Sequence, residues 1–132
     1  MTPNRDIKKL DPTFRRKLEA VIADLAGHGL TVILVEGWRS AKRQAYLYAQ
    51  GRSRPGPIVT YKDGVKKQSR HQSSRAADVY FADGKHLYLP PFGAPEWKLL
   101  ASSCKAHDLY WGGWNRRFKD GPHVEWRGGI IG

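Results

Sequence analysis

An amphipathic helical pattern followed at once by a short apolar segment is the feature that most constrains this fold. Asp11-Pro12 opens the pattern, since Asp caps helices and Pro suits the first helical position. Apolar residues then recur at helical spacing, namely Phe14, Leu18, Val21, Ile22 and Leu25. The next segment, 30–36 (LTVILVE), is rich in β-branched residues and predicts a buried strand. A helix and a strand of this kind predict a domain that contains both helices and strands.

The rest of the chain extends this α+β pattern. Two more helices are predicted, one over 41–50 with Ser40 as its cap and one that starts at Pro95. Short strands are predicted at 76–81, 109–111 and 123–126, and His86 falls in a polar turn. The basic stretch 52–74 contains Pro and Gly and predicts a long loop with a short hairpin around 62–64. We therefore expect one small α+β domain with helices on one side of a short sheet.

Composition narrows the class of protein. The 132 residues include 23 Lys and Arg against 12 Asp and Glu, a net charge of +11 that favours an anionic partner such as nucleic acid, a membrane surface or a cell-wall polymer. The single cysteine, Cys104, excludes an internal disulfide and a four-cysteine zinc site. No apolar run is long enough to span a membrane, and residues 1–10 lack the apolar stretch of a secretory signal. We expect synthesis in the cytoplasm.

Two histidines are accompanied by acids. His71 precedes Asp78 by seven residues, and His123 lies between Asp120 and Glu125. Two imidazoles and one carboxylate make a three-ligand zinc site with an open fourth position for water. A further carboxylate is needed to take the proton of that water, and on spacing alone Asp120 and Glu125 are both candidates.

These segments resemble a known family. Residues 69–78 (SRHQSSRAAD) resemble the S-x-H-x-x-G-x-A-x-D signature of VanY-like zinc peptidases, part of the LAS group named for lysostaphin, D-alanyl-D-alanine peptidases and sonic hedgehog. Residues 120–126 (DGPHVEW) resemble the D-x-P-H-F-E-W tail of phage endolysins that are L-alanyl-D-glutamate peptidases. Residues 37–52 resemble the G-W-R-S, Q and L-Y-A-Q-G-R run of the same branch. The resemblance spans about 36–126.

The resemblance implies a fold and a reactive centre. It implies a hedgehog/DD-peptidase-like fold, a small antiparallel sheet flanked by helices, with a helical region 1–29 before a zinc peptidase core 30–126 in one catalytic domain, 1–132. His71, Asp78 and His123 match the ligands of one zinc ion. Asp120 matches the catalytic acid/base, and Arg39 matches the arginine that binds substrate and steadies the oxyanion.

Other residues receive supporting roles from the same resemblance. Glu125 is placed beside His123, which it orients. Ser69 binds substrate or supports the metal loop. Trp111 and Trp114 line the peptide cleft, although core packing explains these tryptophans equally well.

Three positions depart from the family pattern. Ser74 replaces the usual glycine of H-x-x-G, so this residue is strained if its backbone needs a positive φ. The usual Asp after Gly113 is missing, and Val124 replaces an aromatic residue. None of these changes removes a ligand or the acid.

The implied function is hydrolysis of the peptidoglycan stem peptide by a monomeric zinc L-alanyl-D-glutamate endopeptidase. As a phage endolysin it would wait in the cytoplasm of the infected host until release to the cell wall, with the charge attracting it to the anionic envelope. A D-Ala-D-Ala carboxypeptidase of the same family is the nearer alternative. A basic nucleic-acid-binding module is the alternative from another class, in which the His and acid residues would have no use. No nucleic acid is expected as a partner of the peptidase.

Overall fold

The computed structural model describes residues 2–128, which form three α-helices, five strands and two short 3-10 turns. In chain order these are η1 (Ile7–Lys9), α1 (Pro12–Gly27), β1 (Thr31–Glu36), α2 (Ala41–Ala49), β2 (Ala76–Asp83), β3 (His86–Tyr88), α3 (Pro95–Ala106), β4 (Tyr110–Trp111), η2 (Gly112–Trp114) and β5 (His123–Glu125). The strands form one antiparallel sheet in the order β1-β2-β5-β4, with β3 paired to β2. The α+β expectation is confirmed.

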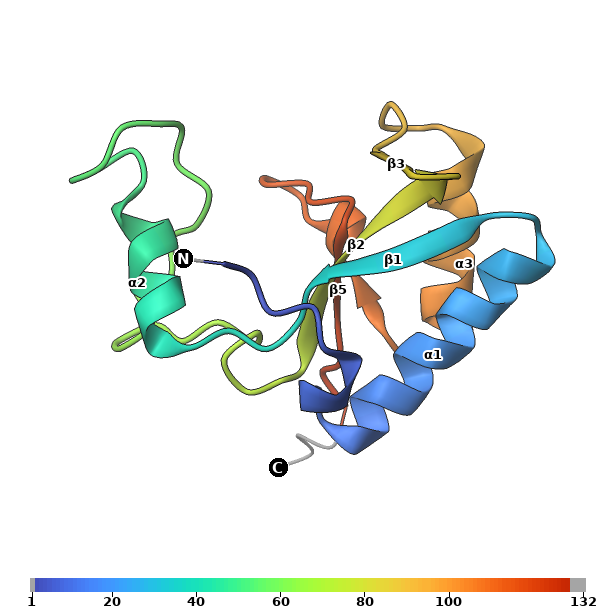
Figure 1. The fold of residues 1–132 in the computed structure, drawn as a ribbon, viewed down its shortest axis with the longest axis horizontal. Helices are drawn as coiled ribbons and strands as arrows, with labels where there is room; N and C mark the ends of the chain where they lie inside the picture. The colour runs from blue at the N-terminus through green and yellow to red at the C-terminus, as the bar shows by residue number, and fades with distance from the viewer. Residues whose placement is uncertain (1, 129–132) are drawn as a thin grey trace.

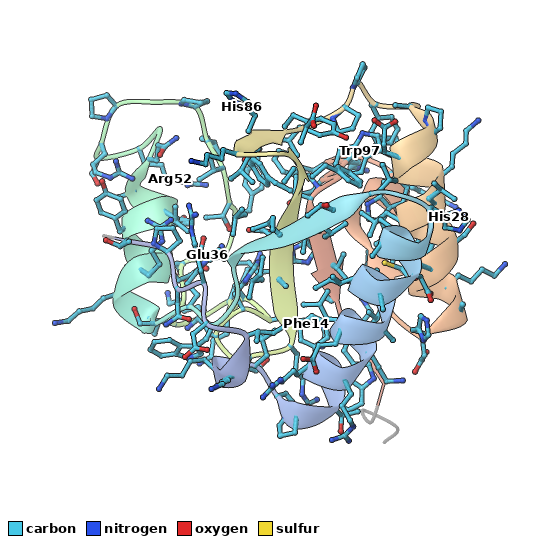
Figure 2. The ribbon with its side chains drawn as sticks, turned by 45° about the vertical axis from the view of Figure 1, so that its right-hand side comes forward. Phe14, His28, Glu36, Arg52, His86 and Trp97 are labelled. Atoms are coloured by element: carbon cyan, nitrogen blue, oxygen red, sulfur yellow. The ribbon has the colours of Figure 1, made fainter. Side chains whose placement is uncertain are left out.

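The core lies between the sheet and two of the helices. α1 and α3 pack side by side, with α1 against β1 and α3 against β4 (Figure 1), and Phe14 points from α1 toward the sheet (Figure 2). Asp11 caps α1 by accepting hydrogen bonds from the amides of Thr13 and Phe14. The apolar faces of both helices are buried, as predicted from their spacing, through Phe14, Leu18, Val21, Leu25, Trp97, Leu100 and Cys104.

The helix α2 is placed differently from the prediction. It is capped by Ser40 as expected, but it stands apart from the other two helices, near the end of β1 that carries Glu36 (Figures 1 and 2). Its one buried residue is the polar Gln44. The expectation of helices on one side of the sheet is therefore wrong for α2, which buries no apolar side chain against the sheet.

Two local expectations are corrected. The segment 52–74 is an irregular loop, as predicted, but no hairpin forms at 62–64. The Asp63 carboxylate accepts hydrogen bonds from the amides of Val65, Lys66 and Lys67, which holds the chain in a turn. His86, predicted in a turn, begins strand β3, which pairs with the end of β2.

The register of β2 and β5 aligns two predicted site residues. Asp78 is the direct cross-strand partner of His123, and Ala77 is the partner of Val124. Because side chains alternate along a strand, Asp78 and His123 share one face of the sheet while Ala77 and Val124 share the other. The second pair is fully buried. No helix of the described chain has the length and apolar character needed to cross a bilayer.

Cys104 is fully buried in α3, and burial raises the pKa of its thiol to about 12. We expect the native protein to resist a thiol reagent such as DTNB, because the thiolate is the reactive form. One equivalent should react after unfolding in guanidinium. Rapid reaction of the folded protein, measured by absorbance, would contradict this placement.

Candidate metal centre and cleft

His71, Asp78 and His123 come together from a loop and two strands. Asp78 Oδ1 lies 3.5 Å from His71 Nε2 and 3.4 Å from His123 Nδ1, and the three ligand atoms all lie within 4.8 Å of one another. Donor atoms that share a tetrahedral zinc ion are separated by about 3.4 Å, given bonds of roughly 2.1 Å. The donor set and its spacing therefore fit a zinc ion.

Backbone contacts orient the His71 ring. Its Nδ1 lies 2.8 Å from the carbonyl oxygen of Gly37, which turns Nε2 toward Asp78. The loop is fixed from both sides, because the amide of His71 donates to Ser69 Oγ and its carbonyl accepts from the amide of Arg39. Ser69 thus supports the loop that carries His71, and it also lines the cleft.

His123 is oriented by a carboxylate. Its Nε2 lies 2.7 Å from Glu125 Oε1, so Nδ1 is the atom that faces Asp78. Glu125 is itself buried and is held by Arg70 Nε at 2.9 Å and Arg127 Nε at 2.6 Å. A hydrogen-bonded partner of this kind fixes the tautomer and direction of a metal-binding imidazole.

The charges around Asp78 and His123 link metal binding to the loss of a proton from His123. Burial alone would raise the pKa of Asp78, but the charges and hydrogen bonds of His71 and His123 lower it well below its ordinary value. Burial works to lower the pKa of His123, but hydrogen bonds to Asp78 and Glu125 raise it to about 9. A metal that binds through His123 at neutral pH must therefore displace a proton.

Asp120 lines the same cleft as the three candidate ligands. Burial raises the pKa of its carboxyl, and the neighbouring charge of Asp78 raises it further. The backbone of Asp120 is fixed at both ends, because its amide donates to Gly112 and its carbonyl accepts from the amide of His123. A Cβ on Gly112 would collide with the Asp120 carbonyl oxygen, which gives this glycine of the Trp111-Gly112-Gly113 run a physical role.

Arg39 is buried at the cleft in a network of charges. Glu36 accepts from its Nε at 3.2 Å and from a terminal nitrogen at 2.9 Å, and Gln44 Oε1 accepts from the other terminal nitrogen at 2.9 Å. Arg43 donates to the same Glu36 carboxylate at 3.0 Å. The Arg39 guanidinium also lies 3.6 Å from Asp78 Oδ2. This network fixes the plane of Arg39 beside the candidate metal ligands.

The cleft has a volume of about 670 Å³ and mixed walls. Besides the three ligands, Asp120 and Arg39, its lining includes apolar and aromatic residues from α2, β2 and two loops. These are Leu47 of α2, Tyr80 of β2 and the loop residues Ile58, Val59, Tyr61 and Phe118, with the lysines Lys62 and Lys119 next in sequence to the two loop rings. The two loop rings were not foreseen, because neither Tyr61 nor Phe118 belongs to a regular element or a recognised motif.

Trp111 and Trp114 are placed away from this lining. Trp111 is only 6% exposed, packs against Trp97 and Phe92, and donates from Nε1 to the Gly121 carbonyl. Trp114 is 40% exposed and contacts Tyr110 and Trp111 edge to face. Neither ring is among the residues that line the cleft. Their contacts favour the packing role over a role in binding substrate.

Ser74 adopts the positive φ that the glycine pattern indicated, with a value of +62°. We expect Ser74→Gly to stabilise the protein by about 0.5–1 kcal/mol, since relief of strain outweighs the added freedom of the unfolded chain. Ser73→Gly is the matched control and should destabilise, because Ser73 is not among the residues with positive φ. Urea unfolding measures both, and a loss of stability in Ser74→Gly would contradict the argument.

Comparison with known proteins places this geometry in a family. A family model described as D-alanyl-D-alanine carboxypeptidase matches residues 63–126, which include all three candidate ligands and Asp120. The chain is 35% identical over 123 residues to the peptidoglycan L-alanyl-D-glutamate endopeptidase CwlK of Bacillus subtilis. That alignment covers 88% of this chain and 72% of the relative.

Solved structures share the fold. The L-Ala D-Glu endopeptidase ChiX of Serratia marcescens matches with a TM-score of 0.64 at 20% identity, over 91% of this chain and 82% of that one. A mutant of the vancomycin resistance D,D-pentapeptidase VanY in complex with Zn(II) matches with a TM-score of 0.62 at 16% identity, over 89% and 72%. Together with the sequence match to CwlK, these findings show that the chain belongs to the VanY-like peptidase family.

Proposed function

We propose that this protein is a zinc-dependent endopeptidase that hydrolyses the L-Ala–D-Glu bond of the peptidoglycan stem peptide. The observation that carries the proposal is the gathering of His71, Asp78 and His123 in one cleft with Asp120. The relative CwlK, which is named for this activity, supports the choice of bond. The Zn(II) of the VanY structure supports the choice of metal.

The side chains of the cleft have distinct tasks in this reaction. Zinc bound by the three ligands supplies a Lewis acid that polarises the scissile carbonyl and makes a water more acidic. Asp120 accepts the proton of the attacking water and later donates it to the departing amine. Its raised pKa suits the second task, because a weaker acid holds the proton until the amine leaves.

Arg39 is positioned to stabilise the negative charge that forms on the carbonyl oxygen. Glu36 and Gln44 accept three of its N–H groups, and a guanidinium has five. Arg39 can therefore keep its plane fixed while it donates to a substrate oxygen, which is the preorganisation that this kind of catalysis requires.

Two other functions compete with this proposal. The description of the matching family model favours a D-alanyl-D-alanine carboxypeptidase, which would use the same centre on a different bond. A nucleic-acid-binding module would leave the metal-binding geometry unused. A zinc assay separates the module from the peptidases, since only the peptidases need stoichiometric metal.

Digestion of purified sacculi with mass analysis of the fragments tests the proposal directly. We expect a new D-Glu amino terminus that disappears on chelation and returns when Zn²⁺ is added. Release of D-Ala alone would identify the carboxypeptidase instead. Unchanged cleavage by the His71→Ala protein would contradict the assignment of the metal centre.

We also propose that the enzyme acts as a phage endolysin, held in the host cytoplasm until a pore admits it to the wall. The resemblance of residues 120–126 to the endolysin tail supports this role. The distribution of charge supports attraction to an anionic envelope, because residues 37–75 contain ten Lys and Arg and a single acid, Asp63. Expression inside bacteria should cause lysis only with a co-expressed pore-forming protein, and lysis without it would contradict retention.

A further inference from the structure

Two aromatic–lysine pairs meet across the cleft, and we propose that they form a clamp for the free carboxylate of the substrate's D-Glu residue. One pair is Tyr61-Lys62 in the loop after α2, and the other is Phe118-Lys119 in the loop before β5. All four residues line the same cleft as the candidate metal ligands. The choice of ligand rests on the proposed function, whereas the clamp itself rests on the geometry that follows.

The two rings are in contact although the core does not require them. Their centroids are 6.3 Å apart and their planes are nearly perpendicular. Tyr61 is 65% exposed and Phe118 is 50% exposed, and neither belongs to the hydrophobic core cluster. An edge-to-face contact stabilises a fold only slightly. Exposed aromatic rings at the wall of a cleft are typical of a ligand-binding surface.

Hydrogen bonds to the backbone hold both pairs in place before any ligand arrives. The buried Gln44 donates from Nε2 to the Lys62 carbonyl at 2.7 Å and to Thr60 Oγ1 at 3.2 Å, which fixes the chain on both sides of Tyr61. On the opposite wall, Asn115 Nδ2 donates to the Phe118 carbonyl at 2.9 Å. A clamp that is already formed loses less conformational entropy when it binds a ligand.

The charges of the cleft point to an anionic ligand at these pairs. Two acids of the cleft are already paired, Asp78 with His71 and His123, and Glu36 with Arg39 and Arg43. Within residues 2–128, no carboxylate lies within ion-pairing distance of the Lys62 or Lys119 ammonium. Lys119 donates instead to the backbone carbonyl of Asn115 at 3.1 Å. Two ammonium groups that lack an acidic partner are complementary to a carboxylate.

The proposed substrate provides such a group. When the amine of D-Glu forms the scissile bond, this residue still has two carboxyl groups. Only one of them can continue the peptide, so the other is free and anionic. The carbon chain of D-Glu can pack against the exposed rings while the free carboxylate meets Lys62. The clamp therefore predicts a preference for stem peptides in which this carboxylate is not amidated.

The test uses two synthetic stem peptides that differ only in this group, which is a free carboxylate in one and an amide in the other. For the zinc-loaded wild-type enzyme, we expect a KM about tenfold lower for the free acid, with a similar kcat. Lys62→Gln should remove this difference by raising KM for the acid alone. Tyr61→Ala should raise KM for both peptides, because its ring packs against the part that they share.

Two lysines outside the cleft lining provide matched controls. Lys66→Gln removes the same charge from the same loop, and Lys85→Gln removes it from the turn between β2 and β3. Both should leave KM unchanged for both peptides. Equal KM values of the wild type for acid and amide would overturn the clamp, and so would equal effects of Lys62→Gln and Lys66→Gln.

Direct binding separates this inference from the proposed reaction. Isothermal titration of the two uncleaved peptides into the Asp120→Asn protein should show about tenfold tighter binding of the acid, lost in the Asp120→Asn/Lys62→Gln double variant. If the wild type cleaves neither peptide but this binding difference persists, the proposed function fails and the clamp stands. If cleavage occurs without the binding difference, the clamp fails and the proposed function stands.

Discussion

Asp120→Asn is expected to lower the rate of stem-peptide cleavage by about a thousandfold. The change keeps the shape of the side chain but removes the group that we propose accepts and returns the proton, and general acid–base catalysis contributes roughly 10²–10⁴ in rate. The loss should appear mainly in kcat, because the role proposed for Asp120 is on the reacting atoms rather than on distant parts of the substrate. Steady-state kinetics on a soluble stem peptide measure it.

Two comparisons make this result specific. Zinc content measured by mass spectrometry should stay at one equivalent in Asp120→Asn, whereas His71→Ala should lose the metal. Asp83→Asn, an exposed change at the end of β2, should keep full activity. Retention of more than a tenth of wild-type activity by Asp120→Asn would rule out its role as the acid/base.

Glu36→Gln is expected to reduce the free energy of unfolding by about 3 kcal/mol, the largest stability effect that we predict. The substitution removes the nearest carboxylate of the buried Arg39 and leaves only the more distant Asp78 Oδ2 at 3.6 Å, and the loss of one partner of a buried ion pair costs roughly 3–5 kcal/mol. Urea unfolding at pH 7 measures the effect. Glu19→Gln is the control, because the exposed pair Arg15–Glu19 should contribute less than about 0.5 kcal/mol.

The effect of Glu36→Gln on stability should also depend on pH, in a direction that the pKa of Glu36 determines. Burial on its own would raise the pKa of Glu36, but hydrogen bonds from Arg39 and Arg43 lower it. A carboxyl whose pKa is lower in the folded than in the unfolded chain stabilises the fold above its unfolded pKa, and this contribution is lost as pH falls. The stability difference between wild type and Glu36→Gln should therefore shrink below about pH 5. A difference that grows in acid would contradict the network.

The sequence predicts those helices and strands that are marked by nearby residues, such as a cap, a proline or a regular spacing of apolar side chains. The cap at Asp11 and the spacing of apolar residues define α1, and Pro95 marks the start of α3. β3 was missed because it is a three-residue strand at the edge of the sheet, too short for an alternating pattern. The hairpin at 62–64 was wrong because the Asp63 side chain binds the amides that would pair across it.

The candidate site could be predicted only in parts. Spacing within the two segments indicated a metal site of two histidines and one carboxylate. The family resemblance implied His71, Asp78 and His123 as its ligands and singled out Asp120 from Glu125. No local pattern shows that Gln44 contacts residues 60–62, or that Tyr61 meets Phe118. Such contacts depend on how two long loops fold over the cleft, and irregular loops have no periodicity from which their partners can be inferred.

Because β2 pairs with β5, a buried valine controls the direction in which the candidate metal ligands point. A shift of β5 by one residue would turn His123 away from Asp78 and bring Val124 into the cleft, because neighbouring side chains point to opposite faces. Such a slip would also remove the fully buried Val124 from the core. Burial of the apolar side of the strand thus disfavours the misaligned state, and a side chain on the face away from the cleft keeps the candidate metal centre in register.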